Sequence, residues 1–199
     1  MGGFKLSIPL VGSGRLGGCA LEEALRSRLD RVCVVTRSGA DIDWLPPAYY
    51  AAERQGRAVQ VPCRDAGMGM SHSLRAGLRA ACAGTLPDAV VVLLADQPLV
   101  TAAMIDRLLD AFREQPKLDY CAAGHEGMPK PPVLLSRTMF SSIEKLTGDQ
   151  GARALLSEPH VFGRIEEEPE ECRFYDADTP EDLERIRFFY SRPFSGLHG

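Results

Sequence analysis

The sequence predicts an α/β fold with a mostly parallel sheet, and two observations support this prediction. An unbroken apolar run over residues 89–95 ends at Asp96, and a helical pattern begins at Thr101. Such a run is typical of a strand that is covered on both faces. In addition, residues 31–36 and 58–61 are strand-like and are separated by a short helix, which is the spacing of a right-handed βαβ unit.

Composition limits the organisation and the partners of the chain. Its 199 residues, of which 45% are apolar, are enough for one good core, so we expect a single domain over residues 1–199 with a loose tail from about residue 191. The formal net charge of -4 argues against a nucleic-acid partner. No segment has the length and apolarity of a membrane span or a secretory signal, so we expect a cytoplasmic protein.

Cysteine usage agrees with a reducing compartment. The six cysteines form no C-x-x-C pair and no spacing typical of a metal site. We expect reduced and mostly buried thiols rather than a disulfide or zinc framework. They are Cys19, Cys33, Cys63, Cys82, Cys121 and Cys172.

In chain order, the pattern alternates between strands and helices after a glycine-rich start, residues 1–18, that contains no strand. The expected strands are residues 31–36, 58–61, 89–95, 118–123, 133–135 and a short strand from residue 173. The expected helices are residues 21–29, a short helix near residue 48, one ending near residue 83, one from residue 101, then 136–146, 148–156 and a closing helix after Thr179. The Pro- and Gly-rich residues 124–132 and the acidic run 166–171 are predicted to be irregular loops.

Asp96 stands where open α/β sheets bind ligands, just beyond the carboxyl end of a strand. A carboxylate in that place is well suited to hold a divalent metal against phosphates. The alternative is that Asp96 only caps the helix that starts near Thr101.

A glycine-rich loop precedes the helix that ends near residue 83. Gly67 and Gly69 allow the backbone to approach a ligand closely, and the hydroxyls of Ser71 and Ser73 add polar groups at the helix start. Together with exposed N–H groups, these features suit a nucleobase or an anion. The alternative is an ordinary serine cap after a flexible turn.

The closing helix carries its own start signal. Thr179 is the expected N-cap, Pro180 takes the first helical position and Asp182 is the capping-box partner. This assignment leaves Asp176 and Asp178 unexplained. Two acids beside the end of a strand are what a second metal carboxylate would look like.

Five motifs in the sequence, taken together, carry a resemblance to a known family. They are residues 69–74, 94–99, 132–134, 148–153 and 176–182. In this order and spacing, which match over nearly the whole chain, they resemble the MobA-like nucleotidyltransferases, although any one motif is weak. The resemblance is greatest to the molybdenum cofactor cytidylyltransferases and to the related accessory proteins that mature xanthine dehydrogenase.

This resemblance implies a Rossmann-like three-layer nucleotidyltransferase fold. It also implies Mg²⁺-dependent transfer of a nucleotidyl group from a nucleoside triphosphate, CTP in the cofactor branch, to the phosphate of molybdopterin, with release of pyrophosphate. A molybdenum hydroxylase such as xanthine dehydrogenase is the implied protein partner. The resemblance implies Lys5 as the catalytic phosphate-binding lysine and Asp96 as a catalytic residue and first metal ligand. It implies Asp178 as the second metal ligand, with Asp176 as a less favoured substitute. The residues implied around the base and ribose are Gly69, Met70, Ser71 and Ser73.

The chain departs from the family pattern at two places. The first strand, glycine turn and arginine of the family signature are absent, and Lys5 falls near the end of that signature, so we expect a start at an internal methionine of a longer reading frame. Pro131 stands where the family usually has a histidine, which leaves the acceptor open, as is the choice between CTP and GTP. Two alternatives to cytidylyl transfer remain: a catalytically silent molybdopterin-binding accessory protein for xanthine dehydrogenase maturation, or transfer to another phosphorylated acceptor.

Overall fold

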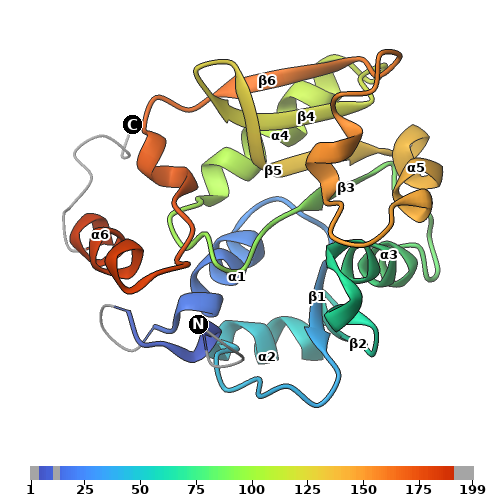
Figure 1. Cartoon of the computed structure of the whole chain (residues 1–199). Helices are drawn as coiled ribbons and strands as arrows, with labels where there is room; N and C mark the ends of the chain where they lie inside the picture. Colours follow the sequence, from blue (N-terminus) through green and yellow to red (C-terminus); the bar gives the residue numbers. More distant parts are fainter. Residues whose placement is uncertain (1–4, 11–13, 191–199) are drawn as a thin grey trace.

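The strands form two sheets in the computed structural model, which describes residues 5–10 and 14–190. One sheet pairs β1 (Val32–Arg37) with β2 (Ala58–Cys63) in parallel (Figure 1). The other has the order β3-β5-β4-β6. Its strands are β3 (Ala89–Val92), β4 (Tyr120–His125), β5 (Met128–Ser136) and β6 (Gly163–Glu167).

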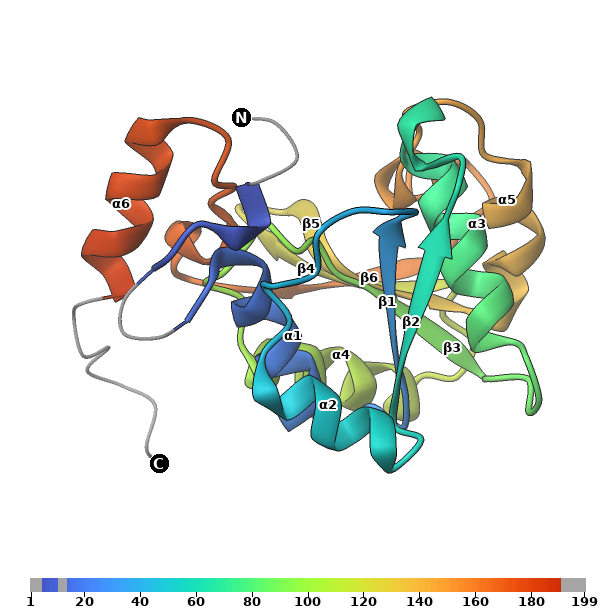
Figure 2. The same cartoon turned by 90° about the horizontal axis from the view of Figure 1, so that it is seen from below.

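Helices cover these strands from two sides. Figure 2 shows α1, α2 and α4 on one side and α3 and α5 on the other, with α6 apart beside the amino-terminal segment. The α-helices are α1 (Leu16–Arg26), α2 (Pro47–Arg54), α3 (Met70–Ala81), α4 (Ala102–Glu114), α5 (Phe140–Lys145) and α6 (Pro180–Tyr190). The 3₁₀ helices are η1 (Lys5–Ser7), η2 (Ala66–Met68), η3 (Arg137–Met139), η4 (Ala152–Leu155) and η5 (Glu171–Phe174). Within the described ranges, no helix has the length and apolarity needed to span a bilayer.

Side chains rather than backbone hydrogen bonds join the two sheets. Among the described residues, β1 pairs with β2 alone and β3 with β5 alone, so each of β1 and β3 keeps one unpaired edge. Val32 of β1 and Val91 of β3 both pack against an apolar cluster that contains Ala24 of α1 and Ile105 of α4. The packing of α1 on α4 therefore links the two halves of the structure.

The apolar run over residues 89–95 is a strand only over Ala89–Val92. Its two faces are covered as predicted, since Val90 and Val92 pack on one apolar cluster and Val91 on another. All four residues of β3 are only half-buried, because β3 lies at an edge of its sheet. A strand can read as continuously apolar and still lack a neighbour on one side, since the apolar pattern reports the covered faces and not the edges.

The predictions of a mostly parallel sheet and of an irregular segment over residues 124–132 also need correction. β5 begins at Met128 and runs antiparallel to both β3 and β4. Glu126 and Gly127, with φ of 52° and 74°, form a tight turn that joins β4 to β5. A hairpin turn of this kind reverses the chain directly, so the prolines that follow belong to a strand.

Several predicted boundaries moved because tertiary pairing overrides local preference. The acidic run was expected to be a loop, yet its first residues belong to β6, which pairs in parallel with β4. The expected strand from residue 173 is instead part of η5, and the expected helix 136–146 divides into η3 and α5. Helix α1 begins at Leu16, five residues before its predicted start at residue 21.

Other predictions are confirmed. β1 and β2 pair in parallel, as the βαβ spacing indicated. The backbone N–H of Thr179 donates to Oδ2 of Asp182 at 3.0 Å, and the N–H of Asp182 donates to Oγ1 of Thr179 at 3.1 Å, which completes the capping box. All six cysteines are free, and each is buried or half-buried. The tail predicted from about residue 191 lies outside the described residues.

Candidate functional site

Lys5, Asp96 and Asp178 meet at one point although they lie far apart in the sequence. Nζ of Lys5 donates to Oδ2 of Asp96 at 2.8 Å and to Oδ1 of Asp178 at 2.6 Å. Lys5 lies in η1, Asp96 follows β3, and Asp178 precedes α6. The Lys5 side chain is 16% exposed, whereas those of Asp96 and Asp178 are 30% and 69% exposed. A cation is therefore enclosed at this point while both carboxylates remain accessible.

The local charges perturb two of the ionisable groups. Burial alone would lower the pKa of Lys5, but its hydrogen bonds to Asp178 and Asp96 outweigh burial and raise the pKa above the ordinary value. Burial raises the pKa of Asp176, and the negative charges of Asp96 and Asp178 raise it further, against a lowering hydrogen bond from Gln97. The site thus holds Lys5 firmly cationic and keeps three carboxyl groups close together.

Asp96 is not the cap of the following helix. The N-cap of α4 is Thr101, whose side chain accepts a hydrogen bond from the backbone N–H of Met104. The capping interpretation of Asp96 is therefore excluded, and its carboxylate is turned instead toward Lys5.

Gln97 is a buried member of the site that the sequence analysis did not single out. Its Nε2 donates to the backbone carbonyl of Phe174 at 3.4 Å, while its Oε1 has no hydrogen-bond partner in the described part of the chain. The backbone N–H of Ala177 donates to the carbonyl of Asp96, so the two acid-bearing segments are joined. The signal that could have found Gln97 is its position as a polar residue between an apolar strand and a proline.

The glycine-rich loop before α3 is packed against the loop at Gly148. A Cβ atom added to Gly69, whose φ is +123°, would lie 2.3 Å from the carbonyl carbon and oxygen of Gly148. The backbone N–H of Ser71 donates to that same carbonyl oxygen at 3.1 Å. Glycine is required at position 69 both for the backbone conformation and for this close approach.

Ser71 does not act as a helix cap. The N-cap of α3 is Gly69, no side chain caps the helix, and Ser71 lies in the first turn. Ser71 is fully buried, and its Oγ has no hydrogen-bond partner within the described ranges. Leaving a buried hydroxyl unpaired is costly, which marks this position as one that a ligand could satisfy.

The remaining predicted residues of this loop flank Ser71. Met70 is 43% exposed, and its sulfur lies against Gly151, where an added Cβ atom would be 2.6 Å away. Ser73 is half-buried in α3. The structure adds Arg37, at the end of β1, whose guanidinium lies near Gly67 and brings a cation to the loop. Neither Arg37 nor Gly148 could be assigned to this place from local sequence.

Both groups of residues follow the carboxyl ends of strands. Asp96 follows β3, and Gly67 and Gly69 follow β2. In Figure 2, the arrowheads of β1 and β2 lie between the dark-blue segment that carries η1 and the turn that leads into α3. The fold therefore places an acidic site and a glycine-rich loop on the side of the sheets where α/β proteins bind their ligands.

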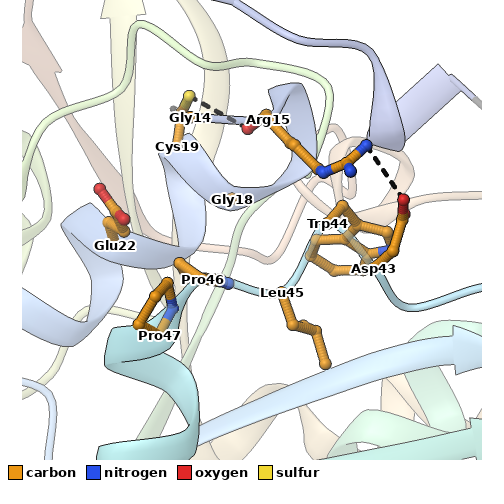
Figure 3. A pocket seen from close by; sticks show the side chains of 10 residues that line it. All are labelled: Gly14, Arg15, Gly18, Cys19, Glu22, Asp43, Trp44, Leu45, Pro46 and Pro47. Atoms are coloured by element: carbon orange, nitrogen blue, oxygen red, sulfur yellow. Dashed lines mark hydrogen bonds and ion pairs between the residues drawn. The ribbon is translucent and has the colours of Figure 1, made fainter. Parts of the chain in front are cut away.

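A small pocket at the start of α1 explains how Lys5 is positioned. Arg15 forms an ion pair with Asp43 at 3.0 Å (Figure 3). Arg15 also donates to the backbone carbonyl of Ser7 at 2.7 Å. Trp44 lies so close to Gly17 that an added Cβ atom would be 2.7 Å from its ring. These contacts tie η1, and hence Lys5, to α1 and to the loop before α2.

A family model for the MobA-like NTP transferase domain matches residues 1–164. The chain belongs to this family. The MobA-like domain model thus covers Lys5, Asp96 and the glycine-rich loop, whereas Asp178 lies beyond the matched range. The curated purine catabolism protein PucB of Bacillus subtilis (strain 168) is 35% identical over 189 residues, which cover 94% of this chain and 89% of that protein.

Solved structures show the same fold. The homologue of Mycobacterium tuberculosis rv0371c from Mycobacterium sp. strain JC1 has a TM-score of 0.71 at 25% identity, covering 93% of this chain and 87% of that chain. Rv0371c of Mycobacterium tuberculosis, solved in complex with manganese, has a TM-score of 0.67 at 22% identity, covering 92% and 91%. Molybdopterin-guanine dinucleotide biosynthesis protein A of Archaeoglobus fulgidus has a TM-score of 0.63 at 18% identity, covering 94% and 90%. This MobA-like chain therefore has the α/β nucleotidyltransferase fold with mixed sheets.

Proposed function

We propose that this protein transfers a cytidylyl group from CTP to the phosphate of molybdopterin and releases pyrophosphate. The observation that carries the proposal is the meeting of Lys5, Asp96 and Asp178 at the carboxyl end of β3. The loop contact between Gly69 and Gly148, with the unpaired hydroxyl of Ser71, supplies a second polar region for the base and ribose. Family membership and the similarity to PucB support the choice of reaction class and of acceptor.

The donor set of the acidic site fits a divalent metal such as Mg²⁺. Two carboxylate oxygens converge on the ammonium of Lys5, which shows that the site already accommodates a cation. Among the described residues, no cluster of three or more acidic, histidine or cysteine side chains could hold a metal by itself. Mg²⁺ needs no such cage, because it is commonly bound by one or two carboxylates together with waters and substrate phosphates. Asp96 and Asp178 would be these two ligands.

In the proposed reaction, an oxygen of the acceptor phosphate attacks the α-phosphorus of the nucleotide in line with the departing group. A new P–O bond forms, the bond to the bridging oxygen breaks, and pyrophosphate leaves with the electron pair. Lys5 keeps Asp96 and Asp178 in place and contributes positive charge beside the leaving pyrophosphate. A metal bound there would neutralise charge on the triphosphate and orient it. Gly69, Met70, Ser71 and Ser73 would line the base and ribose.

Pairing Asp96→Asn with the matched control Asp88→Asn tests the proposal. The two acids flank β3 at opposite ends, and Asp88 is an exposed residue that pairs with Arg137. We expect Asp96→Asn to lower Mg²⁺-dependent pyrophosphate release from CTP and molybdopterin by about a hundredfold or more, with an unchanged melting temperature. Asp88→Asn should retain the parent rate. Parent-like turnover in Asp96→Asn would remove Asp96 from the metal site.

Calorimetric titration of CTP and GTP, each with Mg²⁺, identifies the donor. Binding of CTP in preference to GTP supports cytidylyl transfer. Preference for GTP would exclude CTP as the donor. If neither nucleotide binds, the protein is better explained as a silent accessory that binds molybdopterin and serves a molybdenum hydroxylase such as xanthine dehydrogenase.

A further inference from the structure

Lys130 is connected to the acidic site through Phe174 and Gln97, although no motif of the sequence placed it there. Its Nζ lies over the ring of Phe174, 5.3 Å from the ring centroid. The backbone carbonyl of Phe174 accepts the hydrogen bond from Gln97, the residue that follows Asp96. Phe174 is buried, so the ring that faces the Lys130 ammonium is fixed by the core. A chain of direct contacts therefore leads from Asp96 through Gln97 and Phe174 to the ammonium.

The register of the sheet gives the same location. Ala122 of β4 and Val92 of β3 both pair with Val133 of β5, so they lie at the same height across the sheet. Lys130 pairs with Ala123, one residue further toward the carboxyl end of β4. Along the strand direction, Lys130 therefore lies just beyond Val92, the last paired residue of β3, at the height where the chain continues to Asp96.

The side chain projects from the face that looks toward α4. Ala123 packs with Phe174 and with Met104 of α4. Cross-strand partners lie on one face of a sheet, so Lys130 shares this face with Ala123, in agreement with its contact to Phe174. His125, two residues after Ala123, lies on the same face, and its Nδ1 is 2.8 Å from the carbonyl oxygen of Glu168. Because a carbonyl only accepts hydrogen bonds, this nitrogen carries the proton and the ring is held in place.

The charge of Lys130 is not neutralised by the acids at the end of β6. Glu166 forms an ion pair with Arg164 at 2.6 Å, and Oε1 of Glu167 accepts from the backbone N–H of Gly127 at 2.8 Å. Glu168 forms an ion pair with Arg107, also at 2.6 Å. In the described part of the chain, the structure shows no carboxylate in an ion pair with Lys130. A half-buried cation connected to the proposed nucleotidyl-transfer site is therefore available to an anionic ligand.

We propose that Lys130 binds the phosphate of the acceptor, a phosphomonoester dianion, and so holds its attacking oxygen near Asp96. This proposal rests on the proposed nucleotidyl transfer, which supplies the need for a phosphorylated acceptor. Lys5 already bonds to Asp96 and Asp178 and stands on the side assigned to the leaving pyrophosphate. An in-line displacement needs the acceptor phosphate to be held apart from the leaving pyrophosphate. Lys130, which is separate from Lys5 and has no carboxylate partner among the described residues, is the cation we assign to the acceptor.

The test uses phenyl phosphate as the probe and calorimetry as the measurement, with parent, Lys130→Ala, Lys130→Arg and Lys117→Ala. Lys117 is an exposed lysine that precedes the amino end of β4, so it matches Lys130 in charge but lies at the other end of that strand. Each protein is titrated with the probe in the absence and in the presence of the non-transferring analogue α,β-methylene CTP with Mg²⁺.

We expect Lys130→Ala to raise the dissociation constant of phenyl phosphate about tenfold, because a charge-assisted hydrogen bond is lost. Lys130→Arg should retain most of the affinity, and Lys117→Ala should equal the parent. The affinity for the nucleotide analogue should be the same in all four proteins. Parent-like binding of phenyl phosphate by Lys130→Ala, or no binding of the probe by the parent, would overturn the proposal. Loss of analogue binding in every protein would instead contradict nucleotidyl transfer, and the titrations without analogue would still decide the role of Lys130.

Discussion

At the scale of single residues, Ser71 shows how the site departs from what stability alone would select. Its side chain is fully buried, and its hydroxyl has no partner among the described residues. No internal hydrogen bond offsets the free-energy cost of removing this hydroxyl from water. A hydroxyl that costs stability in the unliganded protein and lies in the first turn of α3, after the glycine-rich loop, is best explained by a ligand that pairs with it.

Replacing Ser71 by alanine separates stability from binding. We expect the free energy of unfolding of Ser71→Ala to be unchanged or higher, because an unpaired buried hydroxyl is removed. The affinity for CTP with Mg²⁺ should fall about threefold to tenfold, the effect of one neutral hydrogen bond. Urea denaturation and calorimetric titration measure the two quantities. Ser141→Ala, at an exposed position of α5, is the control and should change neither. A loss of stability without loss of affinity would assign Ser71 a structural role.

At the scale of elements, the site depends on two loops that touch backbone to backbone. Gly69 precedes α3 and Gly148 follows α5. Their contact joins two glycines that lie 79 positions apart in the sequence. The contact also sets the first turn of α3, because the Gly148 carbonyl accepts from Ser71. The geometry of the proposed base and ribose pocket is therefore decided by this contact.

Gly69→Ala should disrupt this contact, and Gly84→Ala is its matched control. Both glycines have positive φ, +123° and +103°, but an added Cβ atom meets Gly148 at 2.3 Å in the first case and nothing within 4 Å in the second. The two variants share the conformational strain, so the overlap should make Gly69→Ala less stable than Gly84→Ala by about 1–3 kcal/mol. Nucleotide affinity should fall in Gly69→Ala alone. Equal stability and equal affinity of the two variants would argue against a close contact between the loops.

The capping box of α6 should contribute a pH-dependent part of the stability. Hydrogen bonds from the Thr179 side chain and backbone lower the pKa of Asp182 below its ordinary value of 3.8. A lowered pKa means that the folded state binds this proton less readily than the unfolded state, so the contribution is present above pH 3.8 and is lost as the pH falls through the lowered value.

Over a range from about pH 6 to about pH 2, Asp182→Asn should be less stable than the parent at the upper end, and the difference should shrink as the pH falls below 3.8. Thermal unfolding followed by circular dichroism over this range measures the difference. Glu181→Gln, at the neighbouring exposed acid, serves as the comparison and should show no such trend. A difference between Asp182→Asn and the parent that is constant across the range would contradict the assignment.

At the scale of the whole molecule, the two sheets meet through helices. β1 and β3 share no backbone hydrogen bonds in the described residues, and an apolar cluster that contains Ala24 of α1 and Ile105 of α4 connects them. The acidic site and the loop at Gly69 belong to different sheets, since Asp96 follows β3 and Gly69 follows β2. Their relative position therefore depends on helix packing rather than on strand pairing.

Ile105→Ala should weaken both the fold and the site. Ile105 is completely buried, so its truncation should lower the free energy of unfolding by about 2–5 kcal/mol. Because the cavity lies between the halves, hydrogen exchange should increase in β1 and β2 more than in β4 and β5. Leu109→Ala, on the same helix at a partly buried position away from this cluster, should lower the free energy of unfolding less. In that variant, hydrogen exchange should not increase more in β1 and β2 than in β4 and β5. Uniform exchange throughout would show that the two sheets open as one unit.

Local sequence was sufficient where a short-range cause decides the structure. The capping box at Thr179, the parallel pairing of β1 with β2 and the burial of the cysteines all follow from neighbouring residues or from periodicity. The direction of β5 and the inclusion of the acidic run in β6 were missed, because both depend on a partner strand. Asp96 was singled out from its place after an apolar run, whereas Gln97, Arg37 and Lys130 carried no local signal of comparable strength.

The sequence by itself determined the alternation of strands and helices, the family, and the candidate residues Lys5, Asp96, Asp178 and the loop 69–73. Each of these predictions depends only on the order of residues along the chain. Only the tertiary structure decided that Lys5 lies between two carboxylates, that Gly148 closes on Gly69, and that Lys130 stands over Phe174. Such contacts join positions many residues apart, and their free energy depends on packing and pairing that no local pattern encodes.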